Sequence, residues 1–201
     1  MPHPVLCTIA NSVYHQLACD CWTIDRDART WPANQPGIYH PPCGHWGKYS
    51  HNCKQPGRDL APLCVAHVRQ VGGVMEHPLG SQVFRYCGSE PCPGLTDLYG
   101  GTYLLIDQHR FGHRMTKLTW LYFRADTWTP PALPPPSQVP PCDINALSRR
   151  QRSATPIDFA RWLIAGLDNA RPPAYKTPAR PGFPPFLSRV PGVARGLFTS
   201  R

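Results

Sequence analysis

Residues 36–46 read Pro-Gly-Ile-Tyr-His-Pro-Pro-Cys-Gly-His-Trp, and this stretch decides the predicted fold. Its apolar run at 37–39 predicts a short buried strand that ends where the two prolines stiffen the turn. Cys43 would then stand at the exit of the strand. Residues 72–78, Gly-Gly-Val-Met-Glu-His-Pro, repeat the layout and put Glu76 at the end of a second strand. In an open α/β sheet ligands bind beyond the carboxyl ends of the strands, so we expect Cys43 and Glu76 to face one crevice.

The segments on either side of this pair alternate between strand and helix patterns. Residues 59–71 carry apolar side chains at helical spacing, with Asp59 available as a cap, and they connect the two strands in the manner of a right-handed crossover. We further expect strands at 5–10, 21–24, 102–107 and 118–123, a short helical turn at 13–17, and an amphipathic helix at 153–167 that packs back onto the sheet. The predicted fold class is therefore α/β, with a Rossmann-like, mostly parallel sheet flanked by helices.

The length of 201 residues and a 41 % hydrophobic content suit one domain with a core, while 26 prolines imply long irregular stretches. We assign residues 1–128 together with 142–169 to this domain. Residues 129–141 are proline-rich and predict a stiff linker. Residues 170–201 combine prolines and basic residues without an acid, which is typical of a flexible basic tail.

The charge balance favours a polyanionic partner. The chain has 21 Lys and Arg against 12 Asp and Glu, a formal net charge of +9, so we expect nucleic acid, DNA in preference to RNA. No apolar stretch has the length of a membrane-spanning helix, and we expect no membrane partner. The nine cysteines are odd in number, and the N-terminus lacks a signal-peptide pattern, which together favour a reduced, cytoplasmic compartment.

A cysteine and a carboxylate at neighbouring strand ends suit one particular reaction. A thiolate can add to C6 of a pyrimidine when a nearby carboxyl group holds the N3 edge of the ring, because that contact stabilises the charge that builds up on the ring. Cys43 and Glu76 are the two groups that this reaction needs.

These residues also resemble a known family. His-Pro-Pro-Cys at 40–43 and Glu-His-Pro at 76–78 are similar to the Pro-Cys and Glu-Asn-Val motifs of DNA cytosine-5 methyltransferases, and more closely to their small phage-encoded relatives. The resemblance implies that Cys43 is the nucleophile and that Glu76 grips the target base. It also implies a phage or prophage protein in a bacterial host.

A third motif extends the resemblance. Gln108-His109-Arg110 looks like part of the family's Gln-x-Arg-x-Arg motif, whose arginines orient the carboxylate and the base, although Gly112 stands where the second arginine belongs. We therefore expect Gln108 and Arg110 to contact the base. Further candidates for base or phosphate contact are His109, His113, Arg114 and Lys117, with Arg149, Arg150 and Arg152; the alternative is that they are solvated surface charges.

The resemblance implies S-adenosylmethionine as the cofactor. Asp25 and Asp27 follow the strand predicted at 21–24, where nucleotide-binding sheets place an acid for a ribose hydroxyl; equally, these acids could cap a surface loop. The family also has a glycine-rich turn after its first strand, whereas residues 10–13 here read Ala-Asn-Ser-Val.

The sequence leaves several functions open. The alternatives are methylation of cytosine, another modification of a pyrimidine with the same nucleophile, and a non-catalytic nucleic-acid-binding or virion-associated protein. A zinc-binding protein is a separate alternative, since Cys43, His45, His51 and Cys53 lie close together in the sequence. Their spacing lacks a Cys-x-x-Cys pair, so no metal ligand is assigned. A thiol in a closed zinc site could not also be a nucleophile.

Overall fold

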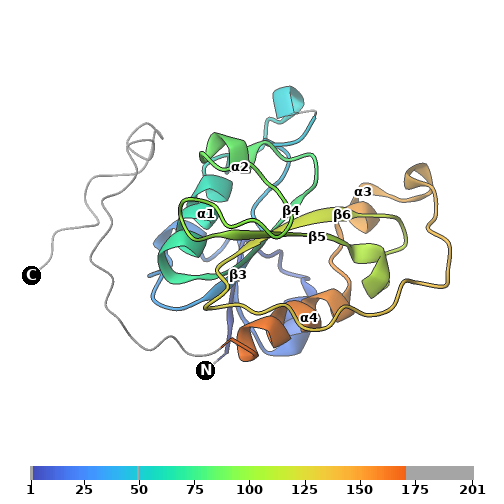
Figure 1. The fold of residues 1–201 in the computed structure, drawn as a ribbon. Coiled ribbons are helices and arrows are strands. Elements are labelled where there is room, and N and C mark those ends of the chain that lie inside the picture. Colours follow the sequence, from blue (N-terminus) through green and yellow to red (C-terminus); the bar gives the residue numbers. More distant parts are fainter. Residues whose placement is uncertain (1, 49, 171–201) are drawn as a thin grey trace, which may run out of the picture.

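The computed structural model describes residues 2–48 and 50–170. Its elements form a mixed six-stranded sheet with helices on both faces, shown in Figure 1. The strands are β1 (Pro4–Leu6), β2 (Asp20–Trp22), β3 (Gly37–Tyr39), β4 (Gly73–Pro78), β5 (Thr102–Asp107) and β6 (Leu118–Phe123). The helices are α1 (Leu60–Val71), α2 (Val83–Tyr86), α3 (Arg149–Ser153) and α4 (Ile157–Asp168). Short 3-10 helices are η1 (Val13–Leu17), η2 (Ala28–Thr30), η3 (Ser50–Asn52), η4 (Gln108–Phe111) and η5 (Ile144–Ala146).

The sheet has the strand order β2-β1-β3-β4-β6-β5. The first four strands are parallel, whereas β6 runs antiparallel to both β4 and β5. The α/β class predicted from the sequence is thus confirmed, and the parallel character holds for the half of the sheet that carries β3 and β4. In that half the strand order reverses between β1 and β3, which is where doubly wound sheets bind ligands.

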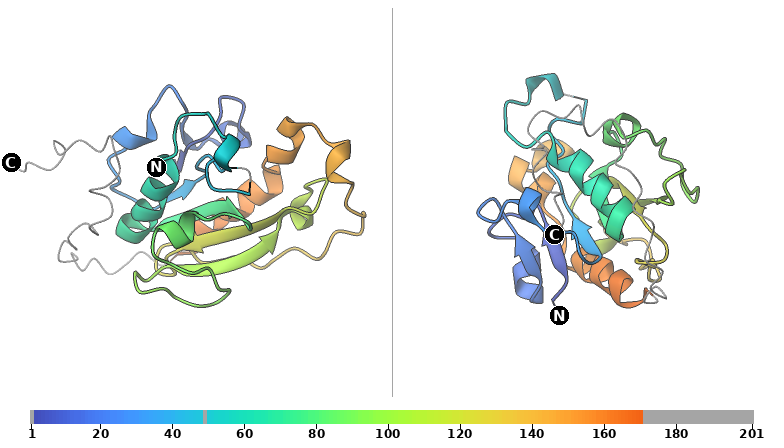
Figure 2. Two further views of the ribbon diagram at one scale, coloured as in Figure 1. Left: turned by 90° about the horizontal axis from the view of Figure 1, so that it is seen from above. Right: turned by 90° about the vertical axis from the view of Figure 1, so that its left-hand side faces the viewer.

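Two hydrophobic cores lie on opposite faces of the sheet because neighbouring strand residues alternate between them. Leu6, Tyr39 and Met75 belong to the core under α1 and α2. Val5, Ile38 and Val74 belong to the core that includes the apolar face of α4. Figures 1 and 2 show the sheet between these helices.

A pair of glycines fixes the start of β4. Gly73 has a φ of +92°, and a Cβ there would lie 2.0 Å from the carbonyl oxygen of Gly37 on β3. The Gly73 amide also donates to Thr127 Oγ1 at 2.9 Å. Only glycine fits such a close approach of two backbones, so the register of β3 against β4, with Gly37 opposite Gly73 and Tyr39 opposite Met75, is set at this point.

Proline and capping residues explain where the helices depart from the sequence prediction. The helix expected at 153–167 corresponds to α4, which starts later, at Ile157, because Pro156 stands at its N-cap. The short helix α3 before it was not predicted; Ser148 and Gln151 form the capping box that starts it. Asp59 precedes α1 without capping it. Its carboxylate instead receives two hydrogen bonds from Arg29, at 2.6 and 2.8 Å.

The first predicted strand is shorter than expected, since β1 ends at Leu6 and Cys7 turns the chain with a φ of 61°. The predicted flexible tail, apart from Ala170, lies outside the described residues. None of the helices in the described part of the chain is long and apolar enough to cross a lipid bilayer.

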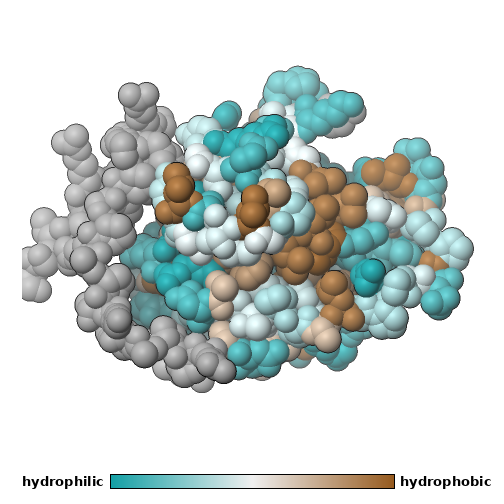
Figure 3. Space-filling model, viewed as in Figure 1, coloured by the Kyte–Doolittle hydropathy of each residue, from teal (hydrophilic) through white to brown (hydrophobic). Residues whose placement is uncertain are grey.

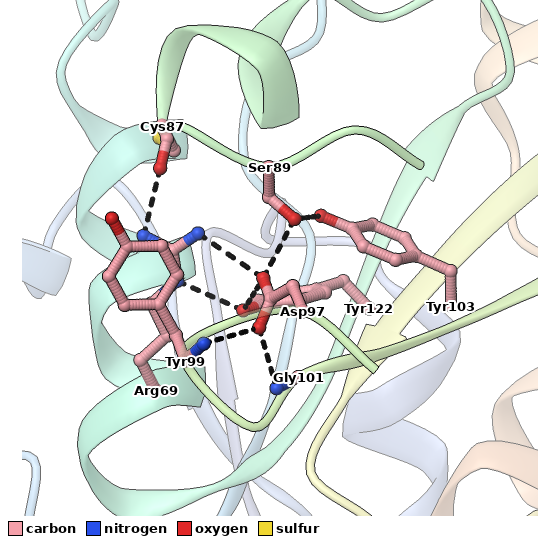
Figure 4. A network of polar contacts seen from close by, with 8 residues as sticks. All are labelled: Arg69, Cys87, Ser89, Asp97, Tyr99, Gly101, Tyr103 and Tyr122. Atoms are coloured by element: carbon pink, nitrogen blue, oxygen red, sulfur yellow. Dashed lines mark hydrogen bonds and ion pairs between the residues drawn. The ribbon is translucent and has the colours of Figure 1, made fainter. Parts of the chain in front are cut away.

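The edge of the sheet at β5 is covered in part by the segment 88–101. The Gly94 amide donates to the Tyr103 carbonyl at 2.8 Å, and Tyr103 returns a bond to Leu95. The carboxylate of Asp97 holds this segment in place, as Figure 4 shows. It accepts hydrogen bonds from Ser89, Tyr122 and the amides of Tyr99 and Gly101, and it pairs with Arg69 of α1.

Hydrophobic side chains gather in a patch near the middle of the face seen in Figure 3, where β5 and β6 run.

Candidate functional site

The carboxyl ends of β3 and β4 bring together two side chains from the two predicted motifs. Tyr39 pairs with Met75, so the next residue of each strand, His40 and Glu76, stand at the same level. His40 Nδ1 lies 3.2 Å from Glu76 Oε2. His40 continues the sheet for one more residue, because its amide donates to the Leu6 carbonyl of β1 at 3.1 Å. His40 and Glu76 are therefore held at strand ends and not on a loop.

A chain of hydrogen bonds runs through this pair. On one side the Tyr14 hydroxyl, from η1, lies 2.8 Å from His40 Nε2. On the other side Gln108 Nε2, at the start of η4, donates to Glu76 Oε1 at 2.9 Å and to Thr119 Oγ1 at 3.0 Å. Tyr14 and Gln108 are buried, and the side chains of His40 and Glu76 are each only 12 % exposed. One hydrogen-bond network around the Glu76 carboxylate thus joins segments that are far apart in the sequence, η1, β3, β4 and η4.

The electrostatics of the site keep Glu76 ionised. Burial by itself would raise the pKa of this carboxyl group, but the hydrogen bond with His40 and the positive charge of Lys117 outweigh it and lower the pKa to about 2. A buried carboxylate that carries its charge must be held by such partners. At neutral pH Glu76 is accordingly an acceptor of hydrogen bonds.

Cys43 shares this electrostatic environment. The residue lies on the loop after β3 and is exposed. Desolvation and the negative charge of Glu76 raise the pKa of its thiol, whereas the charges of Lys117 and Arg149 lower it. The Glu76 charge therefore influences the Cys43 thiol, although no hydrogen bond joins the two side chains within the described residues.

The predicted contact residues of the loop 108–117 divide into two groups. Gln108 and Lys117 belong to the site, since the first binds Glu76 and the charge of the second acts on both Glu76 and Cys43. Lys117 Nζ also donates to the Ala154 carbonyl at 3.1 Å. By contrast, Arg110 donates to the Pro134 carbonyl at 3.1 Å in the proline-rich segment. In this structure Gln108, and not Arg110, donates a hydrogen bond to Glu76.

The other basic candidates lie around the site in different environments. His113 is buried and its Nδ1 lies 3.0 Å from the Met115 carbonyl oxygen, so it is not available for phosphate contact in this structure. His109 contacts the carbonyls of His113 and Val139. Arg114, Arg149 and Arg150 are exposed, and no acidic partner is found for them among residues 2–48 and 50–170. These three arginines are the ones that a phosphate backbone could reach.

The residues expected to bind a cofactor stand apart from this site. Asp25 is exposed. Asp27 caps η2 and pairs with Arg29 at 2.9 Å, so its carboxylate serves the surface loop. Arg26 lies over the Trp22 ring, 4.1 Å from the ring centroid. The loop-capping interpretation therefore describes Asp27 in this structure.

Two residues that sequence reasoning gave no role, Tyr14 and His40, prove central to the site. His40 lies within the His-Pro-Pro-Cys motif, so its position next to the predicted strand end was a signal that could have been used. Tyr14 gave no such signal, because its contact with His40 spans 26 residues of sequence and depends on how η1 packs.

The cysteine and histidine pairs of the sequence do not assemble into a metal centre. Cys53 Sγ lies 3.7 Å from His45 Nε2, and Cys7 Sγ lies 4.0 Å from Cys64 Sγ. Within the described ranges, no group of three or more His, Cys, Asp or Glu side chains could hold a metal ion. The zinc alternative thus finds no site in this part of the chain.

Comparison with known proteins adds no family to this description. No protein-family model matches the chain, and no curated protein matches it.

Proposed function

We propose that this chain modifies a pyrimidine base in nucleic acid, DNA in preference to RNA, with Cys43 as the nucleophile and Glu76 as the group that holds the base. One observation carries the proposal. Glu76 is a buried carboxylate that accepts only two hydrogen bonds within the described protein, from His40 and Gln108, although an ionised carboxylate has about four acceptor positions. The unused positions suit a ligand that donates hydrogen bonds, and the charge of Glu76 influences the thiol of Cys43 on the loop after β3.

The chemistry follows from these two groups. The Cys43 thiolate adds to C6 of the pyrimidine, the C5–C6 double bond opens, and its electron pair moves to C5, which becomes nucleophilic. Carbon 5 then attacks a carbon electrophile carried by a second substrate, whose leaving group departs with the bonding electrons. A base removes the C5 proton, and expulsion of the thiolate restores the C5–C6 double bond. Glu76 accepts a hydrogen bond from the amino group of the base and so holds C6 against the sulfur.

The raised pKa of the Cys43 thiol bears on how this reaction would start. Because the thiol is mostly protonated at neutral pH, addition should accelerate as the pH rises toward the pKa of the thiol. The same observation favours the second candidate function, a nucleic-acid-binding protein without catalysis, since nothing in the site strongly activates the thiol. The exposed Arg114, Arg149 and Arg150 serve either function by contacting phosphates.

A duplex base would have to leave the stack to reach Cys43, at a cost of a few kcal/mol, which phosphate contacts would offset. Single-stranded substrate avoids this cost. We therefore expect faster reaction with single-stranded or mismatched DNA than with a perfect duplex.

The residues where S-adenosylmethionine would bind do not fit it well. The turn after β1 has no glycine and carries side chains at every position, Asp27 is engaged with Arg29, and Arg26 covers Trp22. A cofactor phosphate or ribose site in such sheets needs close backbone approach and a free acid. We derive no step of the reaction through this cofactor.

The deciding experiment uses DNA that contains 5-azacytosine. In this base a nitrogen at position 5 takes a proton, so a thiol adduct is stable without a second substrate. We expect a one-to-one covalent adduct in intact-mass spectra, lost in Cys43→Ser and slowed about 10²- to 10³-fold in Glu76→Gln. Cys92→Ser, which changes another exposed cysteine, is the matched control.

Each other outcome has a defined meaning. Tight DNA binding without an adduct would overturn catalysis in favour of the binding function. An adduct that survives Cys43→Ser would overturn the choice of nucleophile. A parallel reaction with 5-fluorocytosine DNA and S-adenosylmethionine traps an adduct only if a methyl group is transferred, so a product there would show that the cofactor binds despite the β1 turn.

A further inference from the structure

Tyr14 and His40 form a buried pair behind Glu76 whose protons can be placed from geometry. Burial raises the pKa of the Tyr14 phenol well above its usual value, with further contributions from Glu76, Cys19 and Cys21. The phenol therefore keeps its proton. Its oxygen lies 2.8 Å from His40 Nε2, and the two rings pack with centroids 5.2 Å apart.

The protons of a neutral His40 then have one consistent arrangement. If Tyr14 donates to Nε2, that nitrogen must carry the lone pair, and the imidazole proton must sit on Nδ1. Nδ1 is the nitrogen that lies 3.2 Å from Glu76 Oε2. The opposite tautomer would set the Nδ1 lone pair against a carboxylate oxygen and leave Glu76 with one hydrogen bond fewer.

The groups that face His40 all favour this arrangement. Glu76 of β4 is ionised, Tyr14 of η1 is protonated, and Gln108 donates to the far oxygen of the carboxylate. The charge of Lys117 also stabilises the anion. His77, the next residue of β4, is fully buried, and its burial lowers its pKa to about 4, so it is neutral at pH 7.

We propose that Tyr14 and His40 are positioning residues, a relay in which Tyr14 selects the Nδ1–H tautomer of His40 and His40 fixes Glu76 as a hydrogen-bond acceptor. The relay cannot itself supply a proton to the base. Passing one forward from neutral His40 would require Tyr14 to give up its own proton and leave a buried phenolate. Any proton that the N3 edge of the base acquires must therefore come from solvent or from a protonated His40.

The tautomer is a property of the free protein and can be measured without a substrate; only its catalytic consequence rests on the proposed function. Long-range ¹H–¹⁵N correlation spectra of protein labelled at histidine distinguish the two neutral tautomers, and the His40 signals are assigned by their loss in His40→Asn. We expect the Nδ1–H form in the wild type at a pH where the imidazole of His40 is neutral. In Tyr14→Phe, which keeps the ring and removes the hydroxyl, we expect a mixture of tautomers.

Two further variants separate positioning from packing. Asparagine at position 40 can place an amide nitrogen near the position of Nδ1, whereas glutamine reaches toward the position of Nε2. We expect His40→Asn to keep most of the rate of adduct formation and His40→Gln to lose more, with Tyr14→Phe slower by about two- to tenfold. The pH at which adduct formation fails on the acid side should rise in His40→Gln and Tyr14→Phe, a change that a packing defect would not cause.

The outcomes are distinct. Finding the Nε2–H tautomer in the wild type, or an unchanged tautomer in Tyr14→Phe, would overturn the relay. If the expected tautomer is found but no adduct forms in any variant, the relay stands as a feature of the free protein and the proposed catalysis falls.

Discussion

The molecule contains two buried carboxylates, Glu76 and Asp97, that differ in how fully they are bonded. Their side chains are almost equally buried, 12 % and 9 % exposed. Asp97 receives four hydrogen bonds and an Arg69 ion pair, which account for its whole acceptor capacity (Figure 4). Glu76 receives two hydrogen bonds. A carboxylate whose acceptor positions are all used holds the fold together, whereas Glu76 keeps acceptor positions for the ligand that we propose.

The strongest test of this contrast compares alanine variants of the two carboxylates. Asp97→Ala leaves Arg69 and two backbone amides without their acceptor, and we expect it to lower the free energy of unfolding by about 3–5 kcal/mol. Glu76→Ala frees fewer donors, and we expect a loss of about 2 kcal/mol. Urea unfolding at pH 7 measures both. Equal losses would contradict the assignment of Asp97 as structural and Glu76 as functional.

The free energy of unfolding should fall in two separate pH ranges on acidification. Burial lowers the pKa of His67 and His77 to about 4, below the unfolded value of about 6.5. The unfolded chain then binds more protons, so stability falls as the pH drops from about 6.5 to 4. Glu76 has a lowered pKa of about 2; its contribution is fully present above about pH 4.3 and is lost as the pH falls toward 2.

The variant Glu76→Gln should distinguish the two pH ranges, because it removes only the group that titrates in the lower one. The variant lacks the carboxylate, so the acid-induced loss below about pH 4 should shrink by about 2 kcal/mol. The loss between pH 6.5 and 4 should remain and grow slightly, because the Glu76 charge raises the pKa of His77 and its removal lets that pKa fall further. Melting temperatures measured from pH 2.5 to 8 provide the readout. A variant curve parallel to the wild type throughout would show that Glu76 is not ionised in the folded protein.

The smallest predicted effect concerns the thiol. Glu76 raises the pKa of Cys43, so removing its charge in Glu76→Gln should lower that pKa. Alkylation of Cys43 by iodoacetamide at pH 7.5 should then be about two- to fivefold faster. Cys92, which is also exposed, is the internal reference in the same peptide map. An unchanged ratio of the two rates would mean that Cys43 and Glu76 do not share one environment.

Local patterns predicted most elements, and long-range contacts account for the differences. The strands at 37–39, 102–107 and 118–123 agree with the structure because apolar β-forming runs define them directly. The antiparallel direction of β6 was not predicted, since it depends on which strand it pairs with. The helix predicted from 153 onward starts only at Ile157, because Pro156 stands at its N-cap and the apolar periodicity does not register that signal.

The sequence singled out Cys43 and Glu76, and whether they form one site stays a prediction. Cys43 and Glu76 were expected to face each other from two strand ends, and the charge of Glu76 acts on the Cys43 thiol. The partners that hold Glu76 could not be read in the same way. Tyr14 comes from a 3-10 helix, and Gln108, although expected at the site, donates to Glu76 itself, so both contacts depend on how distant segments pack.

The close contact between Gly37 and Gly73 has a consequence for how the chain can change. Each glycine stands three positions before a site residue, His40 on one strand and Glu76 on the other. The contact between the two glycines therefore fixes where both side chains, His40 and Glu76, stand along the sheet. Inserting a single residue after either glycine would turn His40 or Glu76 to the opposite face of the sheet, so natural variation in length should be confined to segments outside these two short spans.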